Sequence, residues 1–382
     1  MYIHQKQLGT LISSVEAGKV VVVYGPRRCG KTTMLGKYIE HVQSTHPETS
    51  ILSVTGEDRL VREYLESESV EKLRSFVGTH TLLIVDEAQK AHNIGLNLKL
   101  IVDHLPGVSI IATGSSSFDL AQKVGEPLTG RKTTLTLFPL SQMEIGQIEH
   151  GHETAAHLED RLLYGSYPDV VLMADKTRRL SYLNDLLSSY LFKDILELDS
   201  VRNSAKLEQL LRLVAFQIGK EVSLNELGTK LGMSKNTVEK YLDLLEKSFV
   251  LYRVSGFSRN LRKEVTKMAR YYFYDNGVRN ALIQNFNPLS LRDDVGMLWE
   301  NYLMSERMKK RGYADIFANQ YFWRTYDQKE IDLVEERDGA LFGYEFKWRA
   351  DARTKEPRDW RIAYPGAHFE VIHPENYLAF IV

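Results

Sequence analysis

The stretch from Val20 to Leu35 constrains the fold of this chain more than any other. It reads VVVVYGPRRCGKTTML, in which four valines and a tyrosine form an apolar run typical of a buried parallel strand. The eight residues from Gly25 to Thr32 fit the pattern G-x-x-x-x-G-K-[ST] and run into a helical sequence. A strand, a glycine-bearing loop and a helix start in this order predict a phosphate-binding loop. The alternative is a strand-to-helix turn that binds no ligand.

Each residue type in this loop has a physical role in nucleotide binding. Gly25 and Gly30 let the backbone curl so that successive N–H groups converge on the β-phosphate, and the helix start directs its positive dipole end at the same anion. We expect Lys31 to bridge the β- and γ-phosphates and Thr32 to place its hydroxyl on Mg²⁺. The sequence therefore predicts ATP and Mg²⁺ as cofactors, with nucleotide contacts from Gly25, Pro26, Arg27, Arg28, Cys29, Gly30, Lys31, Thr32, Thr33 and Ser115.

A second apolar strand sequence, Leu82 to Val85, ends in the two carboxylates Asp86 and Glu87. Ligands of open α/β sheets bind at the carboxyl ends of the strands, so we expect this acidic pair to lie beside the loop. Asp86 is predicted to hold the water shell of Mg²⁺, and Glu87 to polarise the water that attacks the γ-phosphate. Adjacent acids after a strand also occur in solvated turns, which is the alternative.

Three further residues have two interpretations each. Ser115 follows the strand sequence Val108 to Ala112, where its hydroxyl can sense the γ-phosphate or cap the next helix. Arg131 can contact phosphate across a subunit boundary of a homo-oligomer, or simply be solvated. Cys29 lies at a helix start, which favours a thiolate that bound ATP would protect, or it is a small residue that fits the loop.

Composition limits the class of protein. With 382 residues, 43% of them hydrophobic, the chain exceeds what one core usually serves, so two or three domains are expected. Because 49 basic residues nearly balance 50 acidic ones, any attraction to nucleic acid must be local. No apolar run approaches the ~18 residues that span a bilayer, and the single cysteine suits a reducing compartment. These features predict a cytoplasmic protein without membrane partners.

The middle of the chain is predicted to be helical. Residues 155–199 place leucines on apolar faces and are expected to form a lid. The segment Glu221 to Val250 predicts a helix-turn-helix whose second helix starts after Ser234, although three acidic residues offset the lysines of that helix. The basic segment Arg253 to Arg270 would be the wing and would contact DNA. The alternative is a packing domain that couples the lid to the C-terminal part.

The C-terminal part carries a second constellation. A helix from Asp294 to Arg311 carries Glu300, and three strand sequences follow it. Glu345 and Lys347 share one face of the last strand because side chains alternate along it. With Asp332 they form the set D-x(n)-E-x-K: Asp332 and Glu345 as Mg²⁺ ligands, and Lys347 to activate the attacking water, all three predicted as catalytic. The alternative is a solvated strand face.

The segments GPRRCGKTT, LLIVDEAQK, ATGSSS and LTGRKTTLTLFPLS, in this order and spacing, resemble the AAA-type ATPases of bacteria and archaea whose C-terminal half is a domain of unknown function. The resemblance spans essentially the whole chain and implies an ATPase core, a helical and winged-helix middle, and a C-terminal module. That module resembles PD-(D/E)xK nucleases through EIDLV and YEFKW, with Glu300 matching the upstream acid.

The predicted fold class is therefore α/β. We expect an AAA-type αβα P-loop core in residues 1–150, a helical lid plus winged helix in 151–285, and a restriction-endonuclease-like α/β module in 286–382. Two functions fit this architecture. One is an ATP-regulated nuclease acting on DNA, and the other is a nucleotide-switched scaffold whose C-terminal module binds a partner or nucleic acid without cleaving it.

Overall fold

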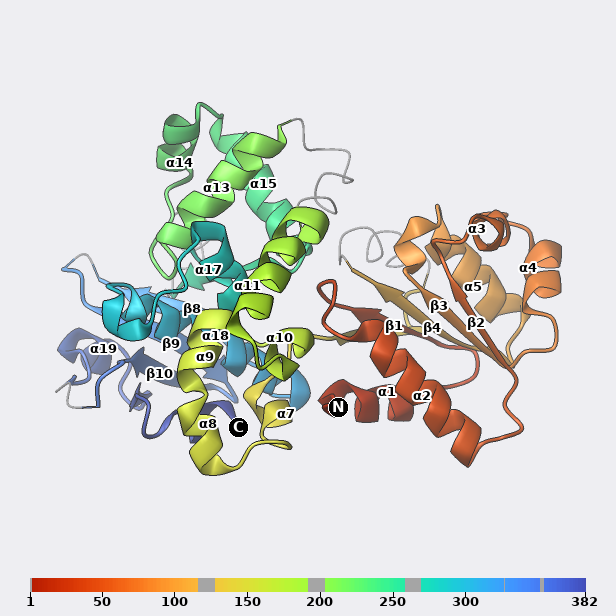
Figure 1. Ribbon diagram of the computed structural model, residues 1–382, viewed down its shortest axis with the longest axis horizontal. Coiled ribbons are helices and arrows are strands. Elements are labelled where there is room, and N and C mark those ends of the chain that lie inside the picture. Colours follow the sequence, from red (N-terminus) through yellow and green to blue (C-terminus); the bar gives the residue numbers. More distant parts are fainter. Residues whose placement is uncertain (1, 116–127, 192–202, 258–268, 326, 351–353) are drawn as a thin grey trace. The chain divides into compact units, whose positions relative to one another are not determined.

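A computed structural model describes residues 2–115, 128–191, 203–257, 269–325, 327–350 and 354–382. The chain divides into two compact units (Figure 1). The N-terminal unit comprises residues 2–139 with 247–249, and the C-terminal unit comprises residues 140–246 with 250–382.

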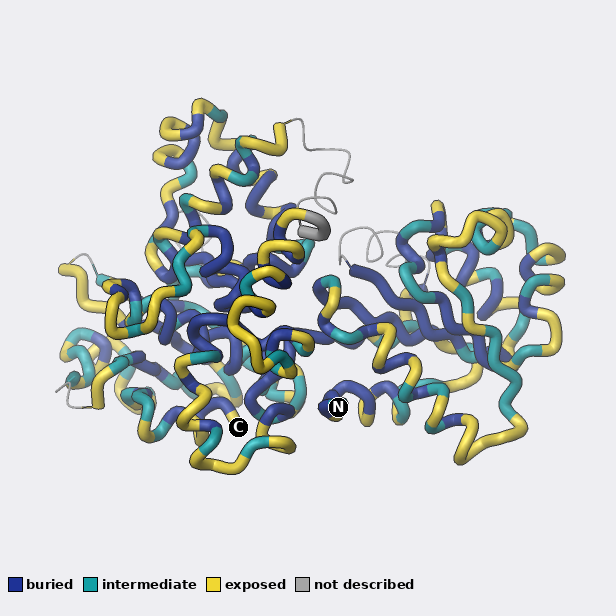
Figure 2. Tube along the Cα trace, in the orientation of Figure 1, coloured by how far each residue is buried: buried dark blue, intermediate teal, exposed yellow. Residues whose placement is uncertain are grey.

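A parallel five-stranded sheet forms the centre of the N-terminal unit. Its strands follow the order β2-β3-β4-β1-β5, with bounds β1 (Val20–Tyr24), β2 (Ile51–Thr55), β3 (Leu82–Asp86), β4 (Ser109–Gly114) and β5 (Lys132–Thr136). Strand β1 pairs with β4 on one side and with β5 on the other, and all five of its residues are buried (Figure 2). Interior parallel strands are apolar on both faces, which explains the run of four valines.

Helices cover both faces of this sheet (Figure 1). They are α1 (Lys6–Ser14), α2 (Lys31–Thr45), α3 (Arg59–Leu65), α4 (Val70–Val77) and α5 (Ile94–His104), with a 3₁₀ turn η1 (Ala88–Lys90). Side chains of α1 and α2, including Leu11 and Met34, pack on the face that carries Val21, Val23 and Ile84. The predicted αβα core is therefore confirmed. Its strands are held between two layers of helices.

The charged stretch from Asp58 to Phe76 forms two helices. Asp58 caps α3, since its Oδ1 accepts a hydrogen bond from the backbone N–H of Leu60 (2.8 Å). Ser69 caps α4 by accepting from the backbone N–H of Lys72 (3.4 Å). A side-chain cap satisfies N–H groups at a helix start, so the second cap begins a new helix within the stretch.

A mixed six-stranded sheet forms the centre of the C-terminal unit. Its order is β11-β10-β9-β8-β6-β7, with bounds β6 (Leu251–Gly256), β7 (Ala269–Phe273), β8 (Asn319–Arg324), β9 (Glu330–Arg337), β10 (Ala340–Phe346) and β11 (His368–Ile372). Strand β6 pairs antiparallel with β7 and parallel with β8, the latter through two residue pairs in the described part of the chain, 255–321 and 256–322. The sheet thus takes strands from both sides of the domain boundary expected at residue 285.

The described residues of the C-terminal unit also form helices. They are α7 (Gln142–Ile145), α8 (Gly151–Ala156), α9 (Leu158–Tyr164), α10 (Pro168–Leu172), α11 (Lys176–Asp185), α13 (Ser204–Phe216), α14 (Leu224–Leu231), α15 (Lys235–Lys247), α17 (Asn276–Ile283), α18 (Val295–Tyr313), α19 (Arg358–Ala363) and α20 (Tyr377–Ile381), with a π-helical turn η2 (Leu186–Leu191) and a 3₁₀ turn η3 (Leu289–Leu291). Trp299 and Tyr302 of α18 pack against Tyr272, Phe322 and Tyr344 of the strands. Within the part of the chain that the structure describes, no helix is both long and apolar enough to cross a bilayer.

The helix-turn-helix lies where the sequence predicted it. Gly232 ends α14 in the left-handed region (φ +60°), and Ser234 accepts a hydrogen bond from the backbone N–H of Thr237 (3.1 Å) at the start of α15. The antiparallel pair β6–β7 follows, and residues 258–268 between these strands lie outside the described residues. A DNA-reading role for α15 stays a prediction.

One buried amide ties the end of β7 to helix α18. Asn301 is fully buried, and its side chain accepts from the backbone N–H of Phe273 (2.7 Å) and donates to the carbonyl of the same residue (3.1 Å). It also donates to the side-chain oxygen of Asn276 (2.6 Å). Backbone groups at this strand end are therefore satisfied by a side chain that lies 28 residues away in sequence.

We expect Asn301→Ala to lower the free energy of unfolding of the C-terminal unit by about 2–3 kcal/mol, because a buried polar group without a partner costs about 1–3 kcal/mol. All four tryptophans lie in this unit, so tryptophan fluorescence in a urea titration reports it selectively. The exposed Asn225→Ala in α14 is the control and should change the midpoint little. An Asn301→Ala midpoint equal to that of the control would contradict this role.

Candidate nucleotide and ion-cluster sites

The phosphate-binding loop predicted from the sequence connects β1 to α2, and its two glycines are required by geometry. A Cβ atom at Gly25 would collide with the backbone carbonyl of Leu137. Gly30 adopts φ +102°, a left-handed conformation, and is the residue that precedes the first turn of α2. Only glycine fits the space at Gly25 and adopts the left-handed backbone at Gly30 without strain. The loop can therefore curl toward a ligand at the helix start.

Lys31 and Gln5 hold the interior of the loop. Lys31 is buried, and its Nζ donates to the backbone carbonyls of Gly25 (2.8 Å) and Pro26 (2.9 Å). Gln5, which precedes α1, donates from its Nε2 to the carbonyl of Cys29 (2.8 Å). The ammonium group therefore lies inside the curl of the loop. Gln5 was missed from the sequence, because a glutamine before a helix gives no signal of a contact 24 residues away.

Hydroxyl groups converge on Asp86 at the end of β3. Thr32 Oγ1 donates to Asp86 Oδ2 (2.8 Å), and the hydroxyl of Thr113 at the end of β4 donates to Asp86 Oδ1. A threonine hydroxyl and a carboxylate are hard oxygen donors of the kind that Mg²⁺ takes, alongside several waters. The residues present thus fit a Mg²⁺ ion held by Thr32 and Asp86.

Glu87 is held by two further contacts. Its backbone lies in the left-handed region (φ +50°), and its N–H donates to Thr113 Oγ1 (3.1 Å). Its carboxylate accepts from the Nε2 of Gln89, which also donates to Ser115 Oγ (3.1 Å). Gln89 therefore joins the residue predicted as general base to the residue predicted as γ-phosphate sensor. Gln89 was missed from the sequence, although its place two residues after Glu87 was a usable signal.

The remaining loop residues differ in exposure. Arg28 is exposed with φ +60°, Arg27 is half-buried, and Thr33 is exposed at the start of α2. Arg131 forms an ion pair with Asp103 on the surface of the same unit. A contact of Arg131 with a nucleotide of a neighbouring copy stays a prediction.

Cys29 is fully buried, in the core cluster that also contains Met34 and Leu35. The thiol therefore packs among apolar side chains, and the structure favours the interpretation of a small residue that fits the loop. Its contribution to a nucleotide site would come from the backbone.

We expect a thiol reagent to label Cys29 slowly in the native chain, at the same rate with and without ATP, because burial limits access. One thiol per chain should react at once after unfolding in guanidinium, which serves as the positive control. Rapid labelling of the native chain that ATP suppresses would contradict this and restore an exposed thiol beside the nucleotide.

The second constellation lies on α18 and strands β9 and β10. The side chains of Glu345 and Lys347 meet, with Lys347 Nζ 2.6 Å from Glu345 Oε1. Asp332 Oδ2 accepts a hydrogen bond from the backbone N–H of Phe346 (2.8 Å), which places this carboxylate beside the same strand end. The structure thus brings together the three residues predicted as D-x(n)-E-x-K.

An arginine that the sequence analysis assigned to the DNA-contacting wing lies among these acids. Arg270 of β7 is buried, and its Nη2 is 2.7 Å from Glu330 Oε2. Its Nη1 is 3.6 Å from both Glu300 Oε1 and Asp332 Oδ1. We call Arg270, Glu300, Glu330, Asp332, Glu345 and Lys347 the ion cluster.

Burial shifts three acids of the ion cluster, Glu300, Asp332 and Glu345, toward their neutral forms. Burial and the nearby charge of Asp332 raise the pKa of Glu345 to about 7. Burial, with the same neighbour, raises the pKa of Glu300 well above its ordinary value, and burial also raises the pKa of Asp332. Burial alone would lower the pKa of Arg270, but Tyr272 and the surrounding carboxylates raise it instead, so the guanidinium stays charged.

The residues of the ion cluster do not fit a bound divalent ion as they are arranged. A divalent ion needs deprotonated carboxylate oxygens that face it. Here one carboxylate oxygen of Asp332 accepts a hydrogen bond from a backbone N–H, and the other faces the guanidinium of Arg270. Glu345 forms an ion pair with Lys347. Among the residues that the structure describes, no three side chains of the His, Cys, Asp or Glu types converge as metal ligands.

The predicted wing is only partly described. Arg253 is exposed on β6, whereas the burial of Arg270 withdraws it from any DNA surface, which corrects its assignment as a DNA contact. The other four basic residues of that segment lie outside the described residues: Arg259, Arg262, Lys263 and Lys267.

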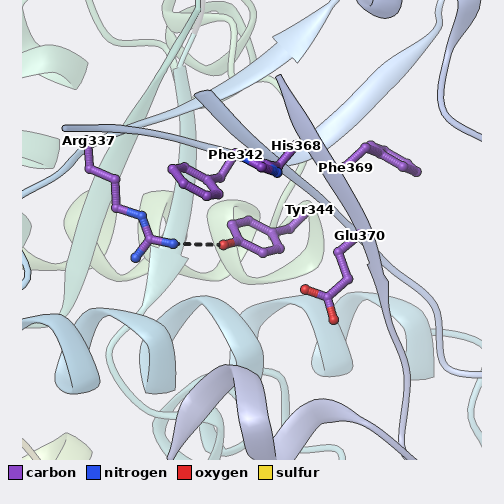
Figure 3. A pocket seen from close by; sticks show the side chains of 7 residues that line it. Arg337, Phe342, Tyr344, His368, Phe369 and Glu370 are labelled. Carbon is purple, nitrogen blue, oxygen red and sulfur yellow. Dashed lines mark hydrogen bonds between the residues drawn. The ribbon is translucent and has the colours of Figure 1, made fainter. Parts of the chain in front are cut away.

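A separate recess of about 400 Å³ lies at the β10–β11 side of the sheet (Figure 3). The ring of Phe342 stacks on His368 (4.7 Å between ring centroids), and the Arg337 guanidinium lies 4.1 Å from the centroid of the Phe342 ring. Arg337 also donates to the hydroxyl of Tyr344 (3.4 Å), as the dashed line in Figure 3 marks. No residue predicted from the sequence as functional lines this recess.

Comparison with protein families assigns three consecutive regions. Residues 17–146 match the family described as an AAA domain. Residues 155–289 and 295–376 match two families described as domains of unknown function, DUF8612 and DUF4143 respectively. Together with the sheet order, the first match confirms the predicted α/β class with an AAA-type core.

Curated relatives occur in bacteria and archaea. An uncharacterized protein of Mycobacterium tuberculosis is 26% identical over 371 residues, covering 91% of this chain and 77% of the relative. An uncharacterized protein of Haemophilus influenzae is 24% identical, covering 93% of this chain and 89% of the relative. A third, from Methanocaldococcus jannaschii, is 24% identical and covers 83% of this chain and 72% of the relative.

Solved structures resemble the chain only distantly. The replication initiator DnaA bound to AMPPCP and single-stranded DNA is 14% identical with a TM-score of 0.33, covering 64% of this chain and 90% of that one. The Pif1 helicase from Candida albicans is 14% identical with a TM-score of 0.29, covering 48% of each chain. Likeness at these scores establishes neither a ligand nor an activity.

Proposed function

We propose that this protein binds and hydrolyses ATP with Mg²⁺ at the loop between β1 and α2. The observation that carries the proposal is the 2.8 Å hydrogen bond between Thr32 and Asp86, which joins the loop to the acidic strand end. The match of residues 17–146 to an AAA domain supports it. The loop amides and the Lys31 ammonium would hold the β- and γ-phosphates, and a Mg²⁺ held by Thr32 and Asp86 would neutralise their charge.

Glu87 is the residue that we propose as general base. Its carboxylate would accept a proton from a water molecule while the water oxygen bonds the γ-phosphorus and the bond from that phosphorus to the β–γ bridging oxygen breaks. The products are ADP and inorganic phosphate. The position of Glu87 at the end of β3, one residue after Asp86, supports this role.

We expect Lys31→Ala to abolish ATP binding, because it removes the ammonium group that lies within the loop. Glu87→Gln should keep ATP affinity and lower kcat by about 10²–10⁴, the range for loss of a positioned base. Binding is measured with a fluorescent ATP analogue, and turnover by phosphate release.

Matched controls lie near both sites. Lys37→Ala, in helix α2 and paired with Glu40, and Glu57→Gln, an exposed acid after β2, should leave binding and turnover unchanged. Wild-type turnover in Glu87→Gln would remove the role assigned to Glu87, and wild-type affinity in Lys31→Ala would remove the site.

For the C-terminal unit we propose the scaffold function, in which it binds DNA or a partner near DNA under control of the nucleotide, without cleavage. The position of Arg270 within the ion cluster favours it. The second candidate is metal-dependent cleavage of a phosphodiester, favoured by the proximity of Asp332, Glu345 and Lys347. The single cysteine suits the cytoplasm, where we place this activity.

Incubation of the full chain with mixed DNA and Mg²⁺ or Mn²⁺, with and without ATP, separates the two candidates. We expect no cleavage in any nucleotide state, and unchanged DNA binding in Asp332→Ala and Lys347→Ala. Cleavage by the wild type that both substitutions abolish would establish the nuclease and contradict the scaffold. A catalytically inactive Glu87→Gln protein shows whether any cleavage requires ATP turnover.

A further inference from the structure

We propose that Arg270 is the resident cation of the ion cluster and occupies the position that a divalent metal ion would otherwise take. The D-x(n)-E-x-K set leads one to expect a metal there, and the structure places a protein side chain in its stead. The inference concerns the C-terminal unit alone and does not depend on ATP hydrolysis.

The first support is the number and origin of the acids around Arg270. Its guanidinium faces Glu300 of α18 and both Glu330 and Asp332 of β9, at 3.6, 2.7 and 3.6 Å. These acids come from two elements that converge on one point. A planar guanidinium carries five N–H donors in a fixed geometry and can serve several carboxylates at once.

The second support is that Arg270 is built into this position. Its guanidinium carbon lies 4.5 Å from the centroid of the Phe322 ring on β8, so an aromatic face packs against it. The residue is 3% exposed. Its backbone also pairs with Glu221, which anchors β7 from the other side. A side chain confined in this way is not a surface arginine that has folded back by chance.

The third support is that the nearby acids already have other partners. Tyr272 donates to Glu300 (2.7 Å), Phe346 N–H donates to Asp332 (2.8 Å), and Lys347 bonds Glu345 (2.6 Å). The guanidinium of Arg270 faces oxygens that these donors leave, Asp332 Oδ1 and Glu330 Oε2, so a metal ion would have to displace it.

It follows that the ion cluster cannot hold the Arg270 guanidinium and a divalent metal ion at the same time. The wild-type ion cluster should bind no Mn²⁺ or Mg²⁺. Within the ion cluster, removal of the guanidinium leaves the carboxyl groups of Glu300, Glu330, Asp332 and Glu345 with the ammonium of Lys347, which is a site of the oxygen-rich, negative kind that divalent ions prefer.

The test uses the full chain without nucleotide, with Asp86→Asn in every protein so that the P-loop contributes no metal site. Mn²⁺ binding is followed by electron paramagnetic resonance and by the dependence of Tm on Mn²⁺. We expect no binding at millimolar Mn²⁺ in this parent. Arg270→Met should gain one Mn²⁺ per chain and a Tm that rises with Mn²⁺, because binding to the folded state stabilises it.

Two further variants give matched controls. Arg270→Lys keeps a cation and should bind no Mn²⁺, and adding Asp332→Asn to Arg270→Met should abolish the gained site. Mn²⁺ binding by the parent that Asp332→Asn removes would overturn the proposal, and this comparison decides the matter even if Arg270→Met fails to fold. A folded Arg270→Met protein that gains no Mn²⁺ would overturn it as well.

Discussion

Parallel pairing of β1 and β3 with the same strand, β4, is the constraint on which the nucleotide site depends. Val22 of β1 and Val85 of β3 both lie opposite Ala112 of β4. Val23 of β1 and the acid Asp86 therefore lie level with each other on either side of Thr113, and the loop begins two residues after Val23. A slip of one residue in either pairing would turn alternate side chains to the opposite face and separate Thr32 from Asp86. The apolar residues of β1 thus position the loop and the acids as well as filling a core.

Buried ion pairs have the corresponding role in the C-terminal unit. Arg307 of α18 bonds both carboxylate oxygens of Glu335 on β9, at 2.8 and 2.7 Å, and Arg279 of α17 pairs with Asp294. Such a pair adds little net stability over an apolar contact, yet loss of one partner costs about 3–5 kcal/mol. The first pair therefore selects which face of α18 meets β9, and the second fixes α17 to the start of α18. The ion cluster around Arg270 belongs to this pattern, and its charged groups have a structural role.

The sequence predicted those features that rest on local pattern. The loop from Gly25 to Thr32, the acid after β3 and the alternation of Glu345 and Lys347 follow from periodicity and short motifs, and the structure has each at its expected element. Arg270 could not be assigned in this way. Its partner Glu330 lies 60 residues further along the chain, and one arginine in a basic segment looks like a surface residue until the sheet order is known. Gln5 could not be assigned either, because its partner Cys29 lies 24 residues further along the chain.

Among the described residues, the pairing of β6 with β8 is the shortest in either sheet, since it rests on two residue pairs where the neighbouring strands of that sheet share five or more. A polypeptide cut near residue 285 would keep β6 and β7 but lose β8, leaving the N–H and C=O groups along β6 without their neighbour. Exposed strand edges of this kind recruit strands from other molecules. The middle and C-terminal regions, although they match separate families, therefore share one hydrogen-bonded sheet, and a fragment of either would expose a surface prone to self-association.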